Sequence, residues 1–300
     1  MRRTLLCTLV LVFSAAFCFA SFNPAYSDYQ FYNLYDLAAD ASYLDDSITA
    51  AADDEEKAAI LWRQARNVLT QTDELSGADK EMLLAGYARS EELARQSIDL
   101  VPTADGYHWL SSAIGRTGQV NGPLNSLSKA EPMRDLIEIV QNDFNADMSD
   151  SWYVLSLLHN QLPGVISFGN KDYAISYMRR CIDTQDNVNR MNLTNYLELA
   201  VQLYDRGWSA EKRAKEADKM ERKYNAETVP TEKMKYYEGR EGRDTKPFYS
   251  TVSIGQMSDA QEAAMLCLYA QAVYDSRPSK LESDSEKYSE IMDFYNSITN

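Results

Sequence analysis

One spacing of residues occurs twice in the chain and constrains its fold more than any other feature. Each copy begins with a large aromatic residue. Leu stands three positions later, Ser four positions later and another bulky side chain seven positions later. The copies are Tyr107-x-x-Leu110-Ser111-x-x-Ile114 and Trp152-x-x-Leu155-Ser156-x-x-His159. These intervals place the side chains on one helix face, where the small Ser lets a neighbouring helix approach. The copies begin 45 residues apart, which predicts repeated helical units.

A second pattern predicts the partner helix of each unit. Its two copies are Ser90-x-x-x-Ala94-x-x-Ser97, followed by Pro102, and Ala174-x-x-x-Met178-x-x-Cys181. Together the two patterns resemble the tetratricopeptide repeat, whose usual length of about 34 residues is shorter than the spacing here. The resemblance implies an elongated repeat with inserted loops. We therefore expect an all-α fold of tetratricopeptide-like helical hairpins that form a curved array, with extra N- and C-terminal helices.

A longer resemblance covers roughly residues 80–183. It rests on the stretches Gly115-Arg116-Thr117-Gly118-Gln119-Val120-Asn121-Gly122, Glu131-Pro132-Met133 and Leu162-Pro163-Gly164, with Lys171 before Ala174. These are similar to exported bacterial tetratricopeptide-like proteins of the regulator-of-microtubule-dynamics-like group, and to the T component associated with tripartite ATP-independent periplasmic (TRAP) transporters. That group tends towards a Gly-Gly-Asp turn after Leu162-Pro163-Gly164. This chain has Phe168-Gly169-Asn170 instead, so the closer subfamily stays open.

Composition supports a helical chain and divides it into segments. Gly and Pro number only 12 and 8 among 300 residues, below their usual combined share of about 12%. Residues 225–256 hold five of these and show no sustained period, which predicts a long loop. The expected segments are a signal peptide at 1–20, an aromatic N-terminal helical segment at 21–52, a tetratricopeptide-like repeat domain at 53–224, the long loop, and C-terminal capping helices at 257–300.

The first twenty residues predict export. Arg2 and Arg3 precede the apolar run 5–19, and Ala20 marks a cleavage point, so the mature protein is expected to be periplasmic or secreted. A retained membrane anchor is the first alternative, but nothing after Ala20 continues the apolar run. A lipoprotein anchored through Cys18 is the second, although Phe17 stands where a small residue is expected. No later stretch reaches the ~20 apolar residues of a transmembrane helix.

The charge of the chain restricts its partners. The formal charge of the full chain is −15. Removal of residues 1–20 lowers Lys and Arg from 30 to 28 against 45 Asp and Glu, so the mature charge is −17. Such a surface repels phosphate backbones and disfavours nucleic acid as a partner. It likewise disfavours anionic lipid head groups, but the charge does not identify a ligand.

Residue types that carry chemistry are few. His108 and His159 are the only histidines, and neither lies in a triad or metal motif. Cys181 and Cys267 lie within apolar helical patterns, which favours buried free thiols, although an oxidising compartment would permit a bridge. We therefore expect no enzyme activity, metal or cofactor. A glycan hydrolase with paired carboxylates is the remaining catalytic alternative.

The repeat pattern nominates a binding face. If the first helices line a concave surface, its positions fall one, five and nine residues after the large aromatic residue. The candidate binding residues are His108, Ser112, Arg116, Tyr153, Leu157 and Gln161. This mixture suits a peptide or a small organic ligand; packing of a loop or terminal helix over the face is the structural alternative. The leading hypothesis is a scaffold for another envelope protein. The alternative is a T-component-like binder of a small hydrophobic or organic ligand that serves a transporter.

Overall fold

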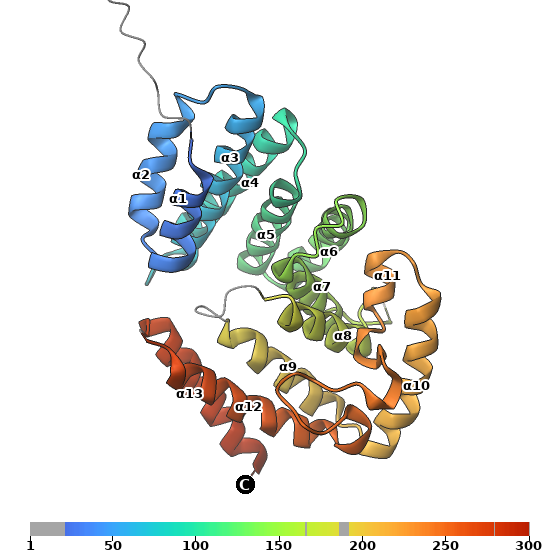
Figure 1. Ribbon diagram of the computed structural model, residues 1–300. Helices are drawn as coiled ribbons and strands as arrows, with labels where there is room; N and C mark the ends of the chain where they lie inside the picture. The colour runs from blue at the N-terminus through green and yellow to red at the C-terminus, as the bar shows by residue number, and fades with distance from the viewer. Residues whose placement is uncertain (1–21, 166, 186–191, 279, 300) are drawn as a thin grey trace, which may run out of the picture.

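The chain folds entirely into helices and connecting segments over the residues that the structure describes (Figure 1). The structure is a computed structural model and describes residues 22–165, 167–185, 192–278 and 280–299. No strand occurs in these ranges, so the expected all-α class is confirmed. The expected signal peptide at 1–20, with Cys18, lies outside the described residues.

The helices follow one another with short connections, and several begin at a side chain that caps the free backbone N–H groups of the first turn. Asp53 caps α3, Thr103 caps α5, and Ser258 forms a capping box with Gln261 at α12. The elements are α1 (Pro24–Asp28), the π-helical η1 (Tyr29–Leu34), α2 (Leu37–Ile48), α3 (Asp54–Asp73), α4 (Lys80–Leu100), α5 (Ala104–Asn121), α6 (Pro123–Glu138), the π-helical η2 (Ile139–Asp143), α7 (Ser149–Gln161), α8 (Lys171–Asp183), α9 (Leu193–Arg206), α10 (Ala210–Ala226), α11 (Pro230–Met234), three 3-10 turns η4 (Tyr237–Gly239), η5 (Gly242–Asp244) and η6 (Ile254–Gln256), α12 (Asp259–Ser276) and α13 (Glu282–Thr299).

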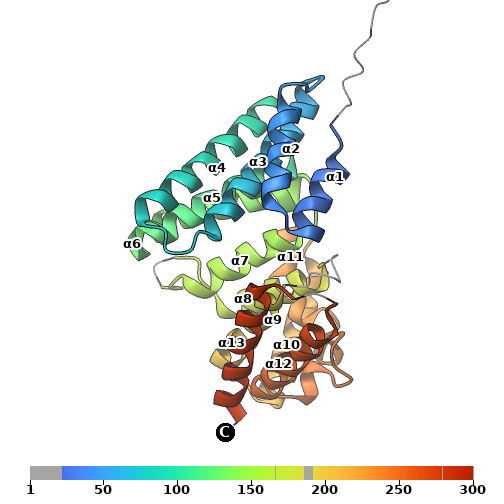
Figure 2. The ribbon, with the colours of Figure 1, turned by 90° about the vertical axis from the view of Figure 1, so that its left-hand side faces the viewer.

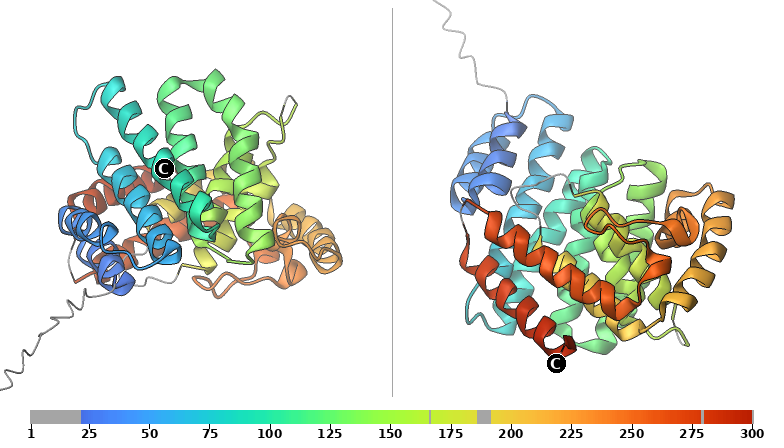
Figure 3. Two further views of the ribbon diagram at one scale, coloured as in Figure 1. Left: turned by 90° about the horizontal axis from the view of Figure 1, so that it is seen from above. Right: turned by 60° about the horizontal axis from the view of Figure 1, so that its bottom comes forward.

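The long helices pack in neighbouring pairs. α3 packs on α4, α5 on α6, and α7 on α8, while α9 takes α12 as its partner although α10 and α11 come between them in the sequence. Successive pairs lie side by side (Figure 3), from the N-terminal helices at one end to α12 and α13 at the other (Figure 2). The molecule is therefore a helical repeat array with an insertion at residues 207–258 inside its fourth described pair.

The first helix of each pair repeats one pattern of burial. The pattern recognised at Tyr107 and Trp152 also begins at Trp62 in α3 and at Tyr196 in α9, so successive copies are 45, 45 and 44 residues apart. In every copy the residues three, four and seven positions after the aromatic residue are buried. Only the two middle copies combine Leu and Ser at these positions, so the sequence pattern indicated those two alone. In α3 the position of the small residue is held by Arg66, which hides the pattern.

The largest hydrophobic core lies among α7, α8, α9 and α12. Trp152 of α7 stacks on Tyr177 of α8, with ring centroids 5.8 Å apart. Cys181 and Cys267 are free thiols buried in this core, and burial raises the pKa of Cys267 to about 11. They pack as apolar side chains and form no bridge.

The segment 225–256 was expected to be a long loop, and the structure gives it more order. It contains α11 and three 3-10 turns, and it packs against α10 and α8. Glu238 and Tyr237 are buried there. Gly239 allows the close approach, because a Cβ at this position would lie 2.5 Å from the Cβ of Met220 in α10.

Candidate binding face

His108, the first predicted site residue, is buried rather than presented to a ligand. Its Nδ1 lies 3.0 Å from the Ser151 hydroxyl at the start of α7, so the pair links α5 to α7. Burial lowers the pKa of His108 despite the nearby carboxylates of Asp150 and Asp105. A neutral imidazole with a hydroxyl partner stabilises helix packing here.

Arg116 and Ser112 lie on the outer part of α5. The side chain of Arg116 is 44% exposed, and its Nη2 lies 2.8 Å from the carboxylate of Asp73 at the end of α3. Asp73 also accepts a hydrogen bond of 2.7 Å from the hydroxyl of Tyr87. Ser112 is half-buried one helical turn before Arg116. Both α5 residues are therefore accessible, and Arg116 is held by an exposed ion pair.

Tyr153 of α7 lies close enough to Arg116 of α5 for the two side chains to interact electrostatically. Burial raises the pKa of Tyr153, the negative charge of Glu198 raises it further, and the positive charge of Arg116 opposes the rise. Arg116 on α5 and Glu198 on α9 thus lie near enough to Tyr153 on α7 to affect the ionisation of its hydroxyl. Leu157 is half-buried on the next turn of α7, and Gln161 is exposed at its end.

Glu198 is a residue of this face that the sequence analysis missed. It is half-buried, and burial raises its pKa while Lys287 of α13 opposes the rise. No hydrogen bond or ion pair joins its carboxylate to another described residue. Glu198 follows Tyr196 by two positions, so recognition of the copy that begins at Tyr196 would have drawn attention to it.

The equivalent face of α3 is already occupied by the N-terminal segment. Arg63, Asn67 and Gln71 stand one, five and nine residues after Trp62. Arg63 donates hydrogen bonds of 3.0 and 2.8 Å to the carboxylate of Asp28. Asn67 and Gln71 both donate to the carbonyl oxygen of Leu37, at 2.9 and 3.2 Å. Packing of a terminal segment, the alternative weighed from sequence, therefore holds for α3.

Buried charges hold the N-terminal segment in place. Arg66 of α3 is fully buried, with its guanidinium 2.8 Å from Asp28 and 3.6 Å from Asp40 of α2. It also lies 4.0 Å from the ring centroid of Phe31. Burial opposes ionisation of Asp28, but Arg63 and Arg66 outweigh it and keep the pKa of this carboxyl below its usual value. The segment is therefore bound firmly to α3.

The accessible remainder of the predicted site is called the open face here. It consists of Ser112 and Arg116 on α5, and Tyr153, Leu157 and Gln161 on α7. It stands beside the covered face of α3 in the array, with Glu198 of α9 adjoining it. Cationic, hydroxyl, aromatic, apolar and amide groups are thus available together on two neighbouring first helices.

A network of buried charges lies at the base of the insertion. Three arginines meet three carboxylates there, and every one of these side chains is at most 5% exposed. The members are Arg179 (α8), Arg206 (α9), Arg213 (α10), Glu238 (η4), Asp259 (α12) and Glu262 (α12). Because the charges balance, the network can remain ionised while it joins five elements.

The network fixes the ionisation of its glutamates. Burial opposes the charge on Glu262, but Arg179 and Arg213 outweigh it and bring its pKa to about 2. Arg179 donates two hydrogen bonds of 2.7 Å to this carboxylate, and the Tyr249 hydroxyl donates a third of 2.6 Å. Arg206 and Arg179 likewise hold the pKa of Glu238 far below its usual value against burial. Both glutamates are structural anions.

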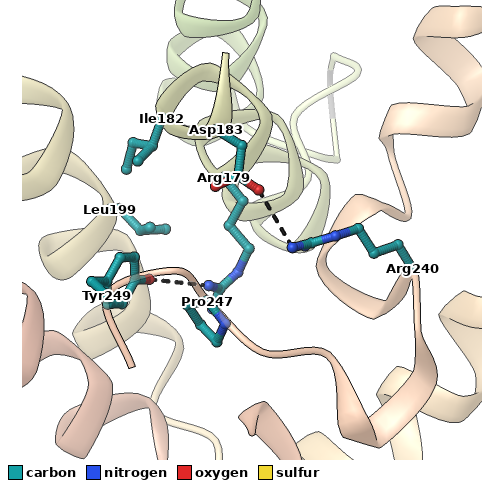
Figure 4. A pocket seen from close by; sticks show the side chains of 7 residues that line it. All are labelled: Arg179, Ile182, Asp183, Leu199, Arg240, Pro247 and Tyr249. Carbon is teal, nitrogen blue, oxygen red and sulfur yellow. Dashed lines mark hydrogen bonds and ion pairs between the residues drawn. The ribbon is translucent and has the colours of Figure 1, made fainter. Parts of the chain in front are cut away.

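A small pocket adjoins the network between Arg179, Arg240 and Tyr249 (Figure 4). The Arg179 guanidinium points to the Tyr249 hydroxyl at 3.3 Å, and Arg240 pairs with Asp183 at 3.4 Å. The cavity volume is about 10 Å³, which is the space that a single water molecule needs. An organic ligand does not fit this pocket.

His159 is enclosed by the aromatic rings of Phe168, Tyr173 and Tyr177, with centroids 5.3 to 5.7 Å away. Burial, with the charge of Lys235, lowers its pKa to about 4, so the ring is neutral near pH 7. In the ranges that the structure describes, no group of three or more His, Cys, Asp or Glu side chains is arranged to hold a metal ion. None of the helices in those ranges has an apolar stretch of the length that a bilayer crossing needs.

Comparison of the chain with protein-family models, with curated proteins and with solved structures finds no match. The function must therefore be argued from the geometry of the open face.

Proposed function

We propose that this protein is an exported tetratricopeptide-like scaffold that binds a segment of another envelope protein through the open face. One observation carries the proposal: the same face of α3 binds the N-terminal segment of the chain itself. There a cation binds a carboxylate, and two amides bind a carbonyl oxygen. The open face offers similar groups one repeat further along, and no described segment forms hydrogen bonds across it.

The side chains of the open face define what the partner should offer. A carboxylate of the partner can replace Asp73 at Arg116, because exposed ion pairs stabilise by only about 0–1 kcal/mol and exchange readily. An apolar or aromatic side chain can cover Tyr153 and Leu157. A cation can neutralise Glu198, whose half-buried carboxylate has no ion-pair partner among the described residues. A peptide segment supplies all three groups in sequence.

The role proposed is binding rather than catalysis. Both histidines are buried and neutral near pH 7, and both glutamates of the charge network are held as anions by arginines. These groups support packing, which leaves the open face as the surface that acts on other molecules.

Affinity capture from the native envelope fraction tests the proposal. Tagged wild-type protein should recover a stoichiometric protein partner, and Arg116→Ala or Tyr153→Ala should reduce the recovered amount severalfold. Arg95→Ala is the matched control, because Arg95 is also an exposed arginine in a surface ion pair, 2.7 Å from Glu91 on α4. Equal recovery by all three variants, with equal melting temperatures, would show that the open face does not bind the partner.

A further inference from the structure

The insertion carries a charge unlike that of the rest of the protein. Residues 207–258 contain 11 Lys and Arg against 9 Asp and Glu, whereas the rest of the chain contains 19 against 36. The insertion is therefore +2 and the remainder −17. In residues 225–256 the five Lys and Arg are offset by five Asp and Glu, so the excess lies in the part of the insertion before residue 225.

The excess is concentrated on one face of α10. Its five cations are all exposed: Lys212, Lys215, Lys219, Arg222 and Lys223. At about 100° per residue they fall within an arc of about 100°, and they extend over about 17 Å of helix. The opposite face packs inward through Arg213, Ala217 and Met220. The five cations are called the α10 stripe here, and α10 lies at the edge of the molecule (Figure 1).

Two acids of α10 beside the stripe are already bound by cations. Arg243 of the insertion binds Asp218 on the flank of the helix and holds the pKa of that carboxyl below its usual value. Glu216 is bound by Lys219 at 2.6 Å. Lys215 and Arg222 form no hydrogen bond or ion pair with another described residue, so the charges of both are available to a partner.

Aromatic rings hold both ends of the stripe. The ammonium group of Lys212 lies 4.5 Å from the ring centroid of Trp208, and that of Lys223 lies 4.9 Å from the centroid of Tyr236. Cation–π contacts of this kind restrict two otherwise flexible side chains. The stripe is thus partly ordered before any partner arrives, which reduces the entropy lost on binding.

We propose that the α10 stripe is a second docking surface, and that it binds an acidic segment of a partner protein with several carboxylates along about 17 Å. Charge complementarity selects this occupant. A nucleic acid fits less well, because it runs past the stripe, where its dense phosphates meet repulsion from the strongly acidic remainder of the chain. The stripe shares no residue with the open face, so a scaffold with both surfaces can hold two proteins.

A fluorescent 12-residue peptide rich in Glu tests the proposal directly, with a Gln-substituted peptide as its neutral counterpart. The acidic peptide should bind wild-type protein, more weakly as salt is added, and the neutral peptide should not. Lys215→Glu with Arg222→Glu should weaken binding by about tenfold or more, since like charges then face the peptide. Lys80→Glu with Arg95→Glu, both exposed cations on α4, is the matched control and should change binding by less than about twofold.

The Arg116→Ala variant should bind the peptide as the wild type does. Failure of the proposal for the open face can therefore be distinguished from failure of the proposal for the stripe. The milder pair Lys215→Gln with Arg222→Gln guards against loss of folding in the charge-reversed variant. The proposal is overturned if wild type does not bind the acidic peptide, if the control pair weakens binding equally, or if a single-stranded oligonucleotide of equal charge binds the stripe more tightly.

Discussion

Arg206 at the end of α9 binds Asp259 at the start of α12 through two hydrogen bonds of 2.8 Å. The backbone closes the same junction, because the N–H of Trp208 donates to Asp259 at 2.8 Å and the N–H of Asp259 donates to the carbonyl of Trp208 at 2.9 Å. Two helices that are 52 residues apart in sequence thus meet as a pair. The two ends of the insertion therefore lie next to each other, and α12 continues the array directly after α9.

Loss of the Asp259 charge should destabilise the protein strongly. Asp259→Asn removes the buried negative charge that Arg206 and Arg213 share. Breaking a buried ion pair in this way lowers the free energy of unfolding by about 3–5 kcal/mol. Urea unfolding followed by circular dichroism measures the free energy of unfolding. Asp205→Asn removes an exposed carboxylate from α9, next to Arg206, and should change that free energy by less than about 0.5 kcal/mol. Similar effects of the two substitutions would contradict the role given to Asp259.

The charge network should make the stability of the protein depend on acid. The pKa of Glu262 is about 2 in the folded state, against an ordinary value of 4.5 for glutamate. A carboxyl whose folded pKa is lowered stabilises the folded state above its unfolded pKa, and this contribution disappears as the pH falls through the folded pKa. The stabilisation by Glu262 should therefore be complete near pH 7 and decline between about pH 5 and pH 2.

Glu262→Gln isolates this contribution from the general effect of acid. The difference in free energy of unfolding between wild type and variant should be largest near pH 7 and shrink steadily below about pH 4, because protonation then makes the two side chains alike. Urea titrations at a series of pH values give this difference. A difference that stays constant from pH 7 to pH 3 would show that the Glu262 charge does not stabilise the fold.

Release of the N-terminal segment should uncover the face of α3 without unfolding the array. Asp28→Asn removes the carboxylate shared by Arg63 and Arg66, so residues 22–48 should lose protection from hydrogen exchange. Peptides from α7 to α9 should exchange as in the wild type. Asp46→Asn, on an exposed position of α2, is the control and should leave the exchange of 22–48 unchanged. Unchanged exchange in the Asp28 variant would mean that other contacts hold the segment.

The sequence predicted the helical repeats because their burial pattern is local. Side chains three, four and seven residues apart share a helix face wherever that helix lies, so Tyr107 and Trp152 were enough to indicate paired helices. The copy at Trp62 escaped because Arg66 replaces the small residue. Arg66 is tolerated there only because Asp28 and Phe31 of the N-terminal segment surround its guanidinium. That arrangement depends on contacts over more than thirty residues, which no local pattern reveals.

The insertion and the charge network could not be predicted for the same reason. Glu238 stands among glycines and mixed charges, where a local pattern indicates a solvated loop. Its burial follows from Arg206 and Arg179, which lie 32 and 59 residues away. At the candidate site the helical offsets nominated Arg116, which is exposed, and Tyr153, which is half-buried. The same rule nominated His108, whose burial depends on the Ser151 hydroxyl of the next repeat.

Site-specific photo-crosslinking at Leu157 tests the central claim, that the open face holds a partner protein, most directly. A photo-crosslinking amino acid at Leu157, between Tyr153 and Gln161 on α7, should form one adduct with an envelope protein, and Arg116→Ala should reduce its yield. The same amino acid at Leu268 on α12, whose side chain is exposed, should form none. Absence of an adduct at Leu157, or the same adduct at both positions, would contradict the account.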